Sequence, residues 1–195
     1  AMRHTTVQLG HYNTAPDYMP GASLFKQLVW FYIGSPLVTG YWMPFSSFKV
    51  KILRLFGASI GQQVRIKPGV RVKFPWRLSV GDSCWLGEQV WIDNLAQVAI
   101  APNVCISQGA YLCTGNHDWS SETFDLRVGP ITIEHSAWIG ARSVVGPGVK
   151  IEAGAVLTLN SVASHTLTAW MIHIGNPAQP VKQRVIRANQ SPIGS

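Results

Sequence analysis

An aliphatic residue recurs at every sixth position through most of this chain, and this period limits the available folds more than any other feature. The repeated positions all hold Ile, Leu or Val and form four runs: Ile60, Ile66, Val72 and Leu78; Val80, Leu86, Ile92 and Val98; Ile100, Ile106 and Leu112; Ile133, Ile139, Val145, Ile151 and Leu157. A period of six matches neither the 3.6-residue period of an amphipathic helix nor the two-residue alternation of a half-buried strand.

Six-residue units fit short strands joined by tight turns, in which each strand sends one aliphatic side chain inward. A small residue often follows the aliphatic one, as at Gly81 and Gly87. One coil of such strands cannot bury its own aliphatic side chains, so the coils must stack into a continuous core. An all-β sandwich is the alternative, but sandwiches do not keep a strict six-residue period. We therefore predict an all-β solenoid over residues 58–165.

The repeat also sets the domain organisation, because it leaves a single domain with two terminal segments. Residues 1–57 precede the first coil, and residues 166–195 form a C-terminal extension. The chain looks irregular before Ser23, which can cap a helix over residues 24–32. A second helix is expected over residues 46–56.

The first terminal segment carries no charged residue from Gln27 to Phe48, a window long enough to suggest a membrane span. Four residues that disfavour a continuous helix interrupt this window: Gly34, Pro36, Gly40 and Pro44. The segment therefore packs against the coils, docks on a membrane surface, or inserts into a membrane. Basic residues beside aromatic and aliphatic ones favour surface docking over insertion.

The repeat is interrupted once, at residues 113–130, by a polar segment too long for a turn. His117 lies in this segment, and histidine is the side chain whose unperturbed pKa is closest to neutral. It can take a proton from a hydroxyl, while Asp118 or a backbone carbonyl holds the other ring nitrogen and fixes the tautomer. Loops on rigid scaffolds commonly carry catalytic groups, so we predict a catalytic role for His117 and Asp118.

Asp93 and Asn94 form a second polar break, because Asp stands where the coils usually carry Gly or Ala. A carboxylate here either holds an acceptor hydroxyl or bonds neighbouring backbone amides. Trp76, Trp85 and Trp91 lie at coil positions other than the inward aliphatic one. An exposed Trp in a solenoid either closes a subunit contact or lines a ligand groove.

Charge and cysteine content limit the partners and the compartment. Lys and Arg number 16 against 9 Asp and Glu, giving a net charge of +7. The basic residues form no dense run, so we expect no nucleic acid; a solvated basic surface, a polyphosphate ligand and an anionic membrane remain open. Cys84, Cys105 and Cys113 are expected to be small buried residues in a reducing compartment. Arg3 and His4 are followed by no apolar core, so we expect no signal peptide and a cytoplasmic protein.

Several stretches resemble the left-handed β-helix acyltransferases that carry hexapeptide repeats, and within them the colanic-acid-biosynthesis acetyltransferases. The stretches are residues 22–26, 53–58, 90–96 and 105–118, the last containing the Thr-Gly-Asn-His-Asp loop, and the closing residues 174–178 with the basic residues 182–184. The resemblance covers nearly the whole chain, including the N-terminal helices.

The resemblance implies left-handed coils, a homotrimer, and acetyl-CoA as co-substrate in a groove between neighbouring β-helices. His117 matches the general base of the family, which deprotonates a sugar hydroxyl that attacks the thioester directly, with no acyl-enzyme. On the family pattern the CoA side comprises Trp138, Ala141, Leu159, Ser164 and Lys182. The acceptor side comprises Asp93, Asn94 and Asn116.

We therefore expect an acetyl-CoA-dependent O-acetyltransferase that modifies a sugar hydroxyl and requires no metal. The acceptor is expected to be an exopolysaccharide precursor, with a peripheral membrane contact through the N-terminal segment. A small sugar, an antibiotic, an amine or another secondary metabolite is the alternative acceptor. A zinc enzyme is a further alternative, because β-helix carbonic anhydrases bind zinc through three histidines, but only His117 and His135 have suitable spacing.

Overall fold

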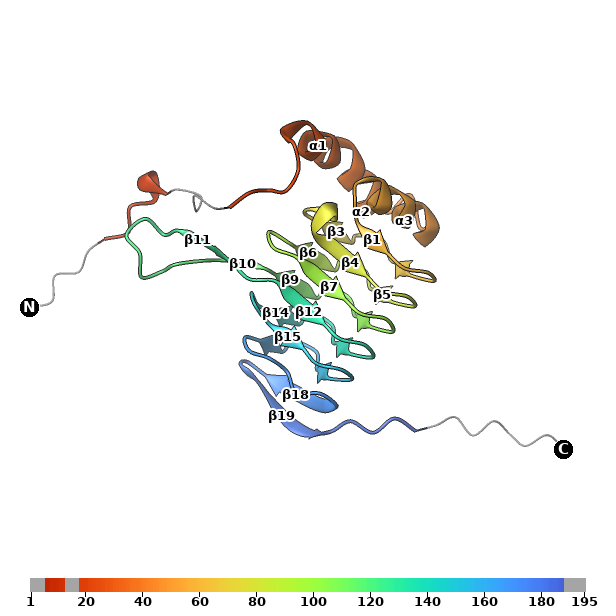
Figure 1. The fold of residues 1–195 in the computed structure, drawn as a ribbon. Helices are drawn as coiled ribbons and strands as arrows, with labels where there is room; N and C mark the ends of the chain where they lie inside the picture. Colours follow the sequence, from red (N-terminus) through yellow and green to blue (C-terminus); the bar gives the residue numbers. More distant parts are fainter. Residues whose placement is uncertain (1–5, 13–17, 188–195) are drawn as a thin grey trace, which may run out of the picture.

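The strands of this chain are two or three residues long over most of the repeat, and they stack in parallel into a β-helix. The computed structural model describes residues 6–12 and 18–187; the remaining residues of the expected terminal segments lie outside this description. Figure 1 shows the coils stacked along one axis, with the helices at one end and the C-terminal strands at the other. The fold is a left-handed parallel β-helix. The repeat predicted the stacked coils, and the resemblance implied their left-handedness.

Three parallel sheets run along the stack. The first contains β1 (Ser59–Ile60), β4 (Leu78–Val80), β7 (Val98–Ile100), β12 (Ile131–Ile133) and β15 (Lys150–Ile151). The second contains β2 (Arg65–Ile66), β5 (Trp85–Leu86), β8 (Cys105–Ile106), β13 (Trp138–Ile139), β16 (Val156–Leu157), β18 (Met171–Gly175) and the antiparallel β19 (Ala178–Gln183). The third contains β3 (Arg71–Val72), β6 (Trp91–Asp93), β9 (Tyr111–Cys113), β14 (Val144–Val145) and β17 (Val162–Ala163).

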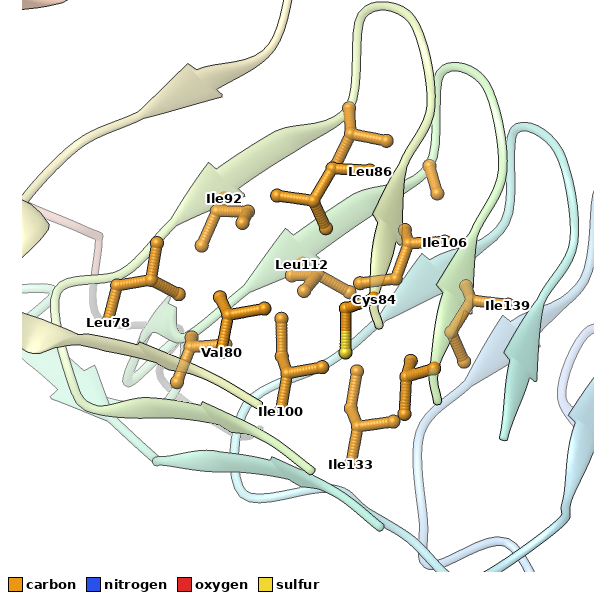
Figure 2. Close-up of a cluster of buried hydrophobic side chains, with 14 of the residues drawn as sticks. Leu78, Val80, Cys84, Leu86, Ile92, Ile100, Ile106, Leu112, Ile133 and Ile139 are labelled. Carbon is orange, nitrogen blue, oxygen red and sulfur yellow. The ribbon is translucent and has the colours of Figure 1, made fainter. Parts of the chain in front are cut away.

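The aliphatic side chains of the repeat form the core. All the positions predicted to point inward are buried, and most of those in the middle coils have no exposed surface. Figure 2 shows Leu86, Ile92, Ile106 and other members of this set converging on the axis of the stack. Each fully buried Leu or Ile contributes roughly 1.5–3 kcal/mol. Of the three cysteines, only Cys84 is fully buried, and the other two are half-buried.

The small residue after each inward aliphatic one has a steric cause. A Cβ atom added at Gly81 would lie 2.6 Å from the Pro102 nitrogen, and one at Gly87 would lie 2.7 Å from the Gln108 nitrogen. At these turns the backbones of successive coils approach too closely for a side chain. The glycines at these turns are therefore a consequence of how tightly the coils stack.

The N-terminal segment packs one face against the first coil. The segment begins with a short 3-10 helix η1 (Leu9–His11). A continuous helical stretch then comprises α1 (Leu24–Val29), the π-helical turn η2 (Trp30–Gly34) and α2 (Ser35–Thr39), and α3 (Ser46–Leu55) follows it. A further 3-10 helix, η3 (Pro75–Arg77), lies between β3 and β4. Ser23 caps α1, since its hydroxyl accepts from the Lys26 amide at 3.3 Å. Trp30, Val38 and Leu53 are buried, and the Trp30 indole donates to the Val72 carbonyl.

Two details of these terminal regions differ from the sequence-based expectation. The helix continues through Gly34 and Pro36 and stops at Gly40. Pro36 follows the π-helical turn, in which the Ser35 amide bonds the Trp30 carbonyl, so the hydrogen-bond pattern of the helix is already shifted where proline lacks its N–H. The parallel stack also continues beyond residue 165, because β18 pairs with β16 and Leu167 is buried. No helix within residues 6–12 and 18–187 is long and apolar enough to cross a membrane.

Candidate active site

The segment that interrupts the repeat forms an antiparallel hairpin of β10 (Gly115–His117) and β11 (Leu126–Val128), in which His117 pairs with Leu126. The hairpin leaves the stack after β9 and returns to it at β12. The parallel register resumes across this excursion, since Val98 pairs directly with Ile131. Thr114 anchors the hairpin base, because its buried hydroxyl donates to the Asp93 carbonyl at 2.9 Å and accepts from the Ala96 amide.

The imidazole of His117 is held on this hairpin with a defined tautomer. Its Nδ1 lies 2.9 Å from the Phe124 carbonyl oxygen, which only accepts, so Nδ1 carries the proton and Nε2 keeps its lone pair. The ring stacks on Phe124 with centroids 4.4 Å apart, and it meets the Tyr12 ring in an edge-to-face arrangement with centroids 5.7 Å apart. Of the two partners considered for the ring nitrogen, the structure therefore uses the backbone carbonyl. A half-buried, tautomerically fixed imidazole is suited to general-base chemistry.

The Asp118 carboxylate bonds elsewhere on the hairpin. It accepts from the hydroxyl and the amide of Ser120 and pairs with Arg127. The Ser120 bonds and the Arg127 charge lower the pKa of Asp118 below its ordinary value. Asn116 is exposed beside His117, and its Oδ1 accepts from the His117 amide at 2.8 Å. Asp118 thus shapes the hairpin and does not contact the imidazole nitrogen.

The two acceptor-side candidates on β6 and the turn that follows have different surroundings. Asp93 is part-buried; its Oδ2 accepts from the Tyr111 hydroxyl at 3.1 Å, and Oδ1 lies 3.0 Å from Lys73 Nζ. Asn94 is fully buried and bonds the backbone of Phe74 and Arg77 through both ends of its amide. The acceptor role expected for Asn94 is therefore wrong in its physical premise, because no polar atom of this side chain faces solvent.

A cavity of about 440 Å³ adjoins the hairpin on the side of the N-terminal segment. Its lining comprises residues to which the sequence analysis assigned no role in the site: Tyr18, Met19, Arg77, Leu95, Ala96, Leu126 and Val128. Leu126 is the register partner of His117, so the cavity lies next to the candidate base. The carbonyl of Phe124 could not have been found from residue type, because it is a backbone group. Leu95 and Ala96 follow the Asp93 break and were detectable only through it.

Three CoA-side candidates meet in a cavity of about 290 Å³ on the second sheet. Trp138, Ala141 and Leu159 line it together with Ser107 and Gln108. The Trp138 ring is half exposed, and its indole donates to the Ser107 hydroxyl at 2.9 Å. The arrangement offers an apolar wall and an aromatic surface to a ligand, as small-molecule sites commonly do.

The two remaining CoA-side candidates lie outside that cavity. Ser164 is exposed after β17, and Lys182 is exposed on β19, opposite Ile172. Lys182 is thus on the outer edge of the same sheet as Trp138. His117 is on a hairpin that leaves the third sheet toward the first, at the corner opposite the second sheet. A single chain therefore holds the candidate base on a different side from Trp138, Ala141, Leu159 and Lys182, whereas Ser164 follows a strand of the third sheet, as the hairpin does. Over the residues that the structure describes, no three His, Cys, Asp or Glu side chains gather into a metal-binding group.

Comparisons with known proteins add a relative that spans nearly the whole chain. No family model matches. The WcaF protein of Escherichia coli strain K12, an acetyltransferase assigned to colanic acid biosynthesis, is 35% identical over 178 residues, covering 88% of this chain and 94% of WcaF.

Solved structures share the fold. A hexapeptide-repeat acetyltransferase of Vibrio cholerae has a TM-score of 0.73 at 22% identity, covering 83% of this chain and 94% of that one. The complex of the same protein with acetyl-CoA gives a TM-score of 0.71. A maltose O-acetyltransferase of Clostridium difficile has a TM-score of 0.71 at 18% identity, covering 84% of this chain and 89% of that one.

Proposed function

Since the chain belongs to the hexapeptide-repeat acetyltransferases, together with the colanic acid biosynthesis protein WcaF, we propose a specific reaction for it. In this reaction an acetyl group moves from acetyl-CoA to a sugar hydroxyl, with His117 as general base. The observation that carries this proposal is the fixed tautomer of His117. Its Nδ1 proton is committed to the Phe124 carbonyl, which leaves Nε2 as the basic nitrogen. Acetyltransfer itself follows from the family; the base, the co-substrate and the acceptor are the proposal.

The reaction needs two proton transfers and one acyl transfer. Nε2 of His117 takes the proton of the acceptor hydroxyl as the hydroxyl oxygen attacks the thioester carbonyl carbon. The C–S bond then breaks, the acetyl group stays on the sugar oxygen, and the imidazolium returns its proton to the CoA thiolate. A positioned base contributes about 10²–10⁴-fold to such a reaction. The Phe124 carbonyl supports the imidazolium, because it accepts from Nδ1 in both protonation states.

We assign acetyl-CoA to the cavity of Trp138, Ala141 and Leu159, whose apolar and aromatic lining suits the pantetheine arm. Lys182 lies farther along this side of the molecule, on β19, where its ammonium can pair with a CoA phosphate. Ser164 follows β17 of the third sheet and would reach the co-substrate from another side. The acetyl-CoA complex of the Vibrio cholerae structural relative supports this co-substrate.

The separation of His117 from the CoA side in one chain favours a homotrimer. In a closed ring of three copies, the hairpin of one chain can face the second sheet of its neighbour, so that each site is completed between chains. Static light scattering tests this assembly, and an active monomer would contradict it.

The cavity beside the hairpin is the proposed acceptor site, and Asp93 lies near its Tyr18 wall. Asn116 does not line the cavity, and a contact with the acceptor would have to come from the part of the sugar that extends beyond it. Arg77 and Tyr18 bring polar groups to a cavity otherwise lined by aliphatic side chains. This mixture suits a sugar ring, which presents both hydroxyl groups and apolar C–H faces. The name of WcaF supports an exopolysaccharide precursor as the acceptor.

A thiol-release assay with acetyl-CoA tests the proposal. The panel comprises free sugars, nucleotide sugars, lipid-linked sugars, chloramphenicol and an amine. Release with a sugar, and an ester at one hydroxyl of the product, is the expected result. Release with chloramphenicol or the amine alone, and with no sugar, would overturn the choice of acceptor.

A further inference from the structure

The outer side of the N-terminal helical segment exposes a group of aromatic side chains that the site does not use. Six of them lie within twenty-one consecutive residues and form what we call the aromatic patch: Phe25, Phe31, Tyr32, Tyr41, Trp42 and Phe45. Their side chains are between 59% and 77% exposed. The same segment buries Trp30 and Val38 on its inner side, so the patch is a second apolar face and not part of the core.

Phe25, Phe31 and Tyr32 lie on the helical stretch, and a helix in contact with water normally carries polar residues on its outer side. The other three rings lie in the connection between α2 and α3. Here no charged residue occurs from Gln27 to Phe48. Exposed apolar side chains gathered in this number on one segment are typical of a docking surface. Figure 1 places these helices at one end of the stack, away from the C-terminal strands.

The charges of the molecule are distributed unevenly with respect to the patch. Residues 18–81 contain no Asp or Glu, although they make up about a third of the chain. The same stretch holds nine of the sixteen basic residues: Lys26, Lys49, Lys51, Arg54, Arg65, Lys67, Arg71, Lys73 and Arg77. The remaining seven basic residues are outnumbered by the nine acidic ones. The positive charge of the protein is therefore concentrated at the end that carries the patch.

The apolar and the basic features meet in one cavity of about 630 Å³ between the helices and the third sheet. Leu24, Leu28 and Phe31 line its helical wall. Arg71 and Lys73 line the opposite wall, where Lys73 is paired with Asp93 and Arg71, among the residues that the structure describes, carries the unpaired charge. Apolar and basic side chains are therefore close together in the folded molecule, and not only in the sequence.

We propose that this end of the molecule docks on the surface of an anionic lipid bilayer, with the aromatic patch at the level of the lipid headgroups. Aromatic rings are enriched at membrane–water interfaces, and clustered Lys and Arg are attracted to anionic headgroups. Amphipathic segments with these two features lie in the interface plane. A second copy of the chain is a poorer occupant, because it would bring the same positive charge against the patch. The proposal does not depend on the proposed function.

Cosedimentation of the full chain with vesicles tests this surface. Binding is expected to vesicles of equal parts phosphatidylcholine and phosphatidylglycerol, and to weaken by about tenfold or more with phosphatidylcholine alone or at about 0.5 M salt, because salt screens surface charge. Equal binding to both vesicle types would overturn the electrostatic part of the proposal. Binding to neither would overturn it entirely.

Two matched pairs of variants locate the contact. Phe25→Ser with Trp42→Ser removes two exposed rings of the patch, and Val185→Ser with Ile186→Ser removes two exposed apolar side chains at the other end of the chain. Lys51→Glu and Arg187→Glu change the net charge equally at the two ends. In each pair, the variant at the patch end is expected to have a vesicle partition coefficient at least tenfold lower than that of the unchanged chain. The other variant is expected to partition as the unchanged chain does.

Thermal unfolding should be unchanged in all four variants, because each side chain is exposed. Equal partitioning within both pairs would contradict docking through the patch. Light scattering without lipid provides the other test. If Phe25→Ser with Trp42→Ser lowers the assembled mass, the patch is a subunit contact and the membrane proposal fails.

Discussion

The hairpin β10–β11 and the coils on either side of it differ in strand pairing and in burial. Every coil repeats one packing pattern, in which short parallel strands bury an aliphatic side chain against the coils above and below. Residues 115–130 of the hairpin segment are antiparallel or irregular, and none of them is fully buried. The coil above the hairpin still pairs with the coil below it. Because a solenoid is stabilised by contacts between neighbouring coils, an excursion between two of them adds only the entropy of closing a loop.

This difference predicts that stability and turnover depend on different residues. His117→Ala should lower kcat by about 10²–10⁴-fold, because the hydroxyl then loses its base. The thermal unfolding temperature should stay unchanged, because the ring lies on the hairpin and outside the core. His135→Ala, at an exposed histidine on a coil turn, is the matched control. The thiol-release assay measures the turnover of both variants. Full turnover of His117→Ala would contradict the proposed mechanism.

A matched pair of leucines tests the same separation from the side of stability. Leu112→Ala should destabilise the fold by about 2–5 kcal/mol, because Leu112 is fully buried in the stack and its removal leaves a cavity. Leu126→Ala on the half-buried hairpin should cost less than about 1 kcal/mol. Denaturant unfolding measures both, and similar losses would show that the hairpin belongs to the cooperative core.

Substitutions of two asparagines should also differ in their effect on stability, by a smaller amount than those of the two leucines. Asn94→Ala should lower the free energy of unfolding by about 1–3 kcal/mol, because it leaves buried backbone groups at residues 74–77 without their partner. Asn116→Ala, at an exposed site beside His117, should leave stability unchanged. Chemical denaturation of the two variants decides this. A stable Asn94→Ala with impaired acceptor binding would instead restore the acceptor role.

The smallest expected effect concerns pH and a histidine within the stack. Burial lowers the pKa of His173, which is 1% exposed, below its ordinary value. In the unfolded chain this group has a pKa of about 6.5, so the unfolded state binds the proton first as the pH falls. Stability should therefore decrease below about pH 6.5, down to the lowered pKa of the folded state. Unfolding at about pH 7.5 and about pH 5.5 should show a smaller decrease for His173→Gln than for the original chain, and equal decreases would contradict it.

The six-residue period was sufficient to predict the solenoid and its core, because one structural unit is repeated and each copy reports the same inward position. The interruption at residues 113–130 was equally visible, and it directed attention to His117. The repeat did not reveal that the helix passes through Gly34 and Pro36, because local preferences there give way to packing of Trp30 and Val38 on the first coil. Nor did it show that the stack continues past residue 165, where the side-chain period ends but the backbone pairing does not.

By itself the sequence determined the strand period, the inward positions and the long interruption that carries His117, since these are properties of spacing along the chain. Only the tertiary structure decided which atom orients the imidazole, because that atom is a backbone carbonyl brought back by the turn of the hairpin. It also decided that Asn94 bonds the backbone and that Trp138 and Leu159 share a cavity. These contacts join residues from different strands and turns, and the geometry of folding alone sets the distance between them.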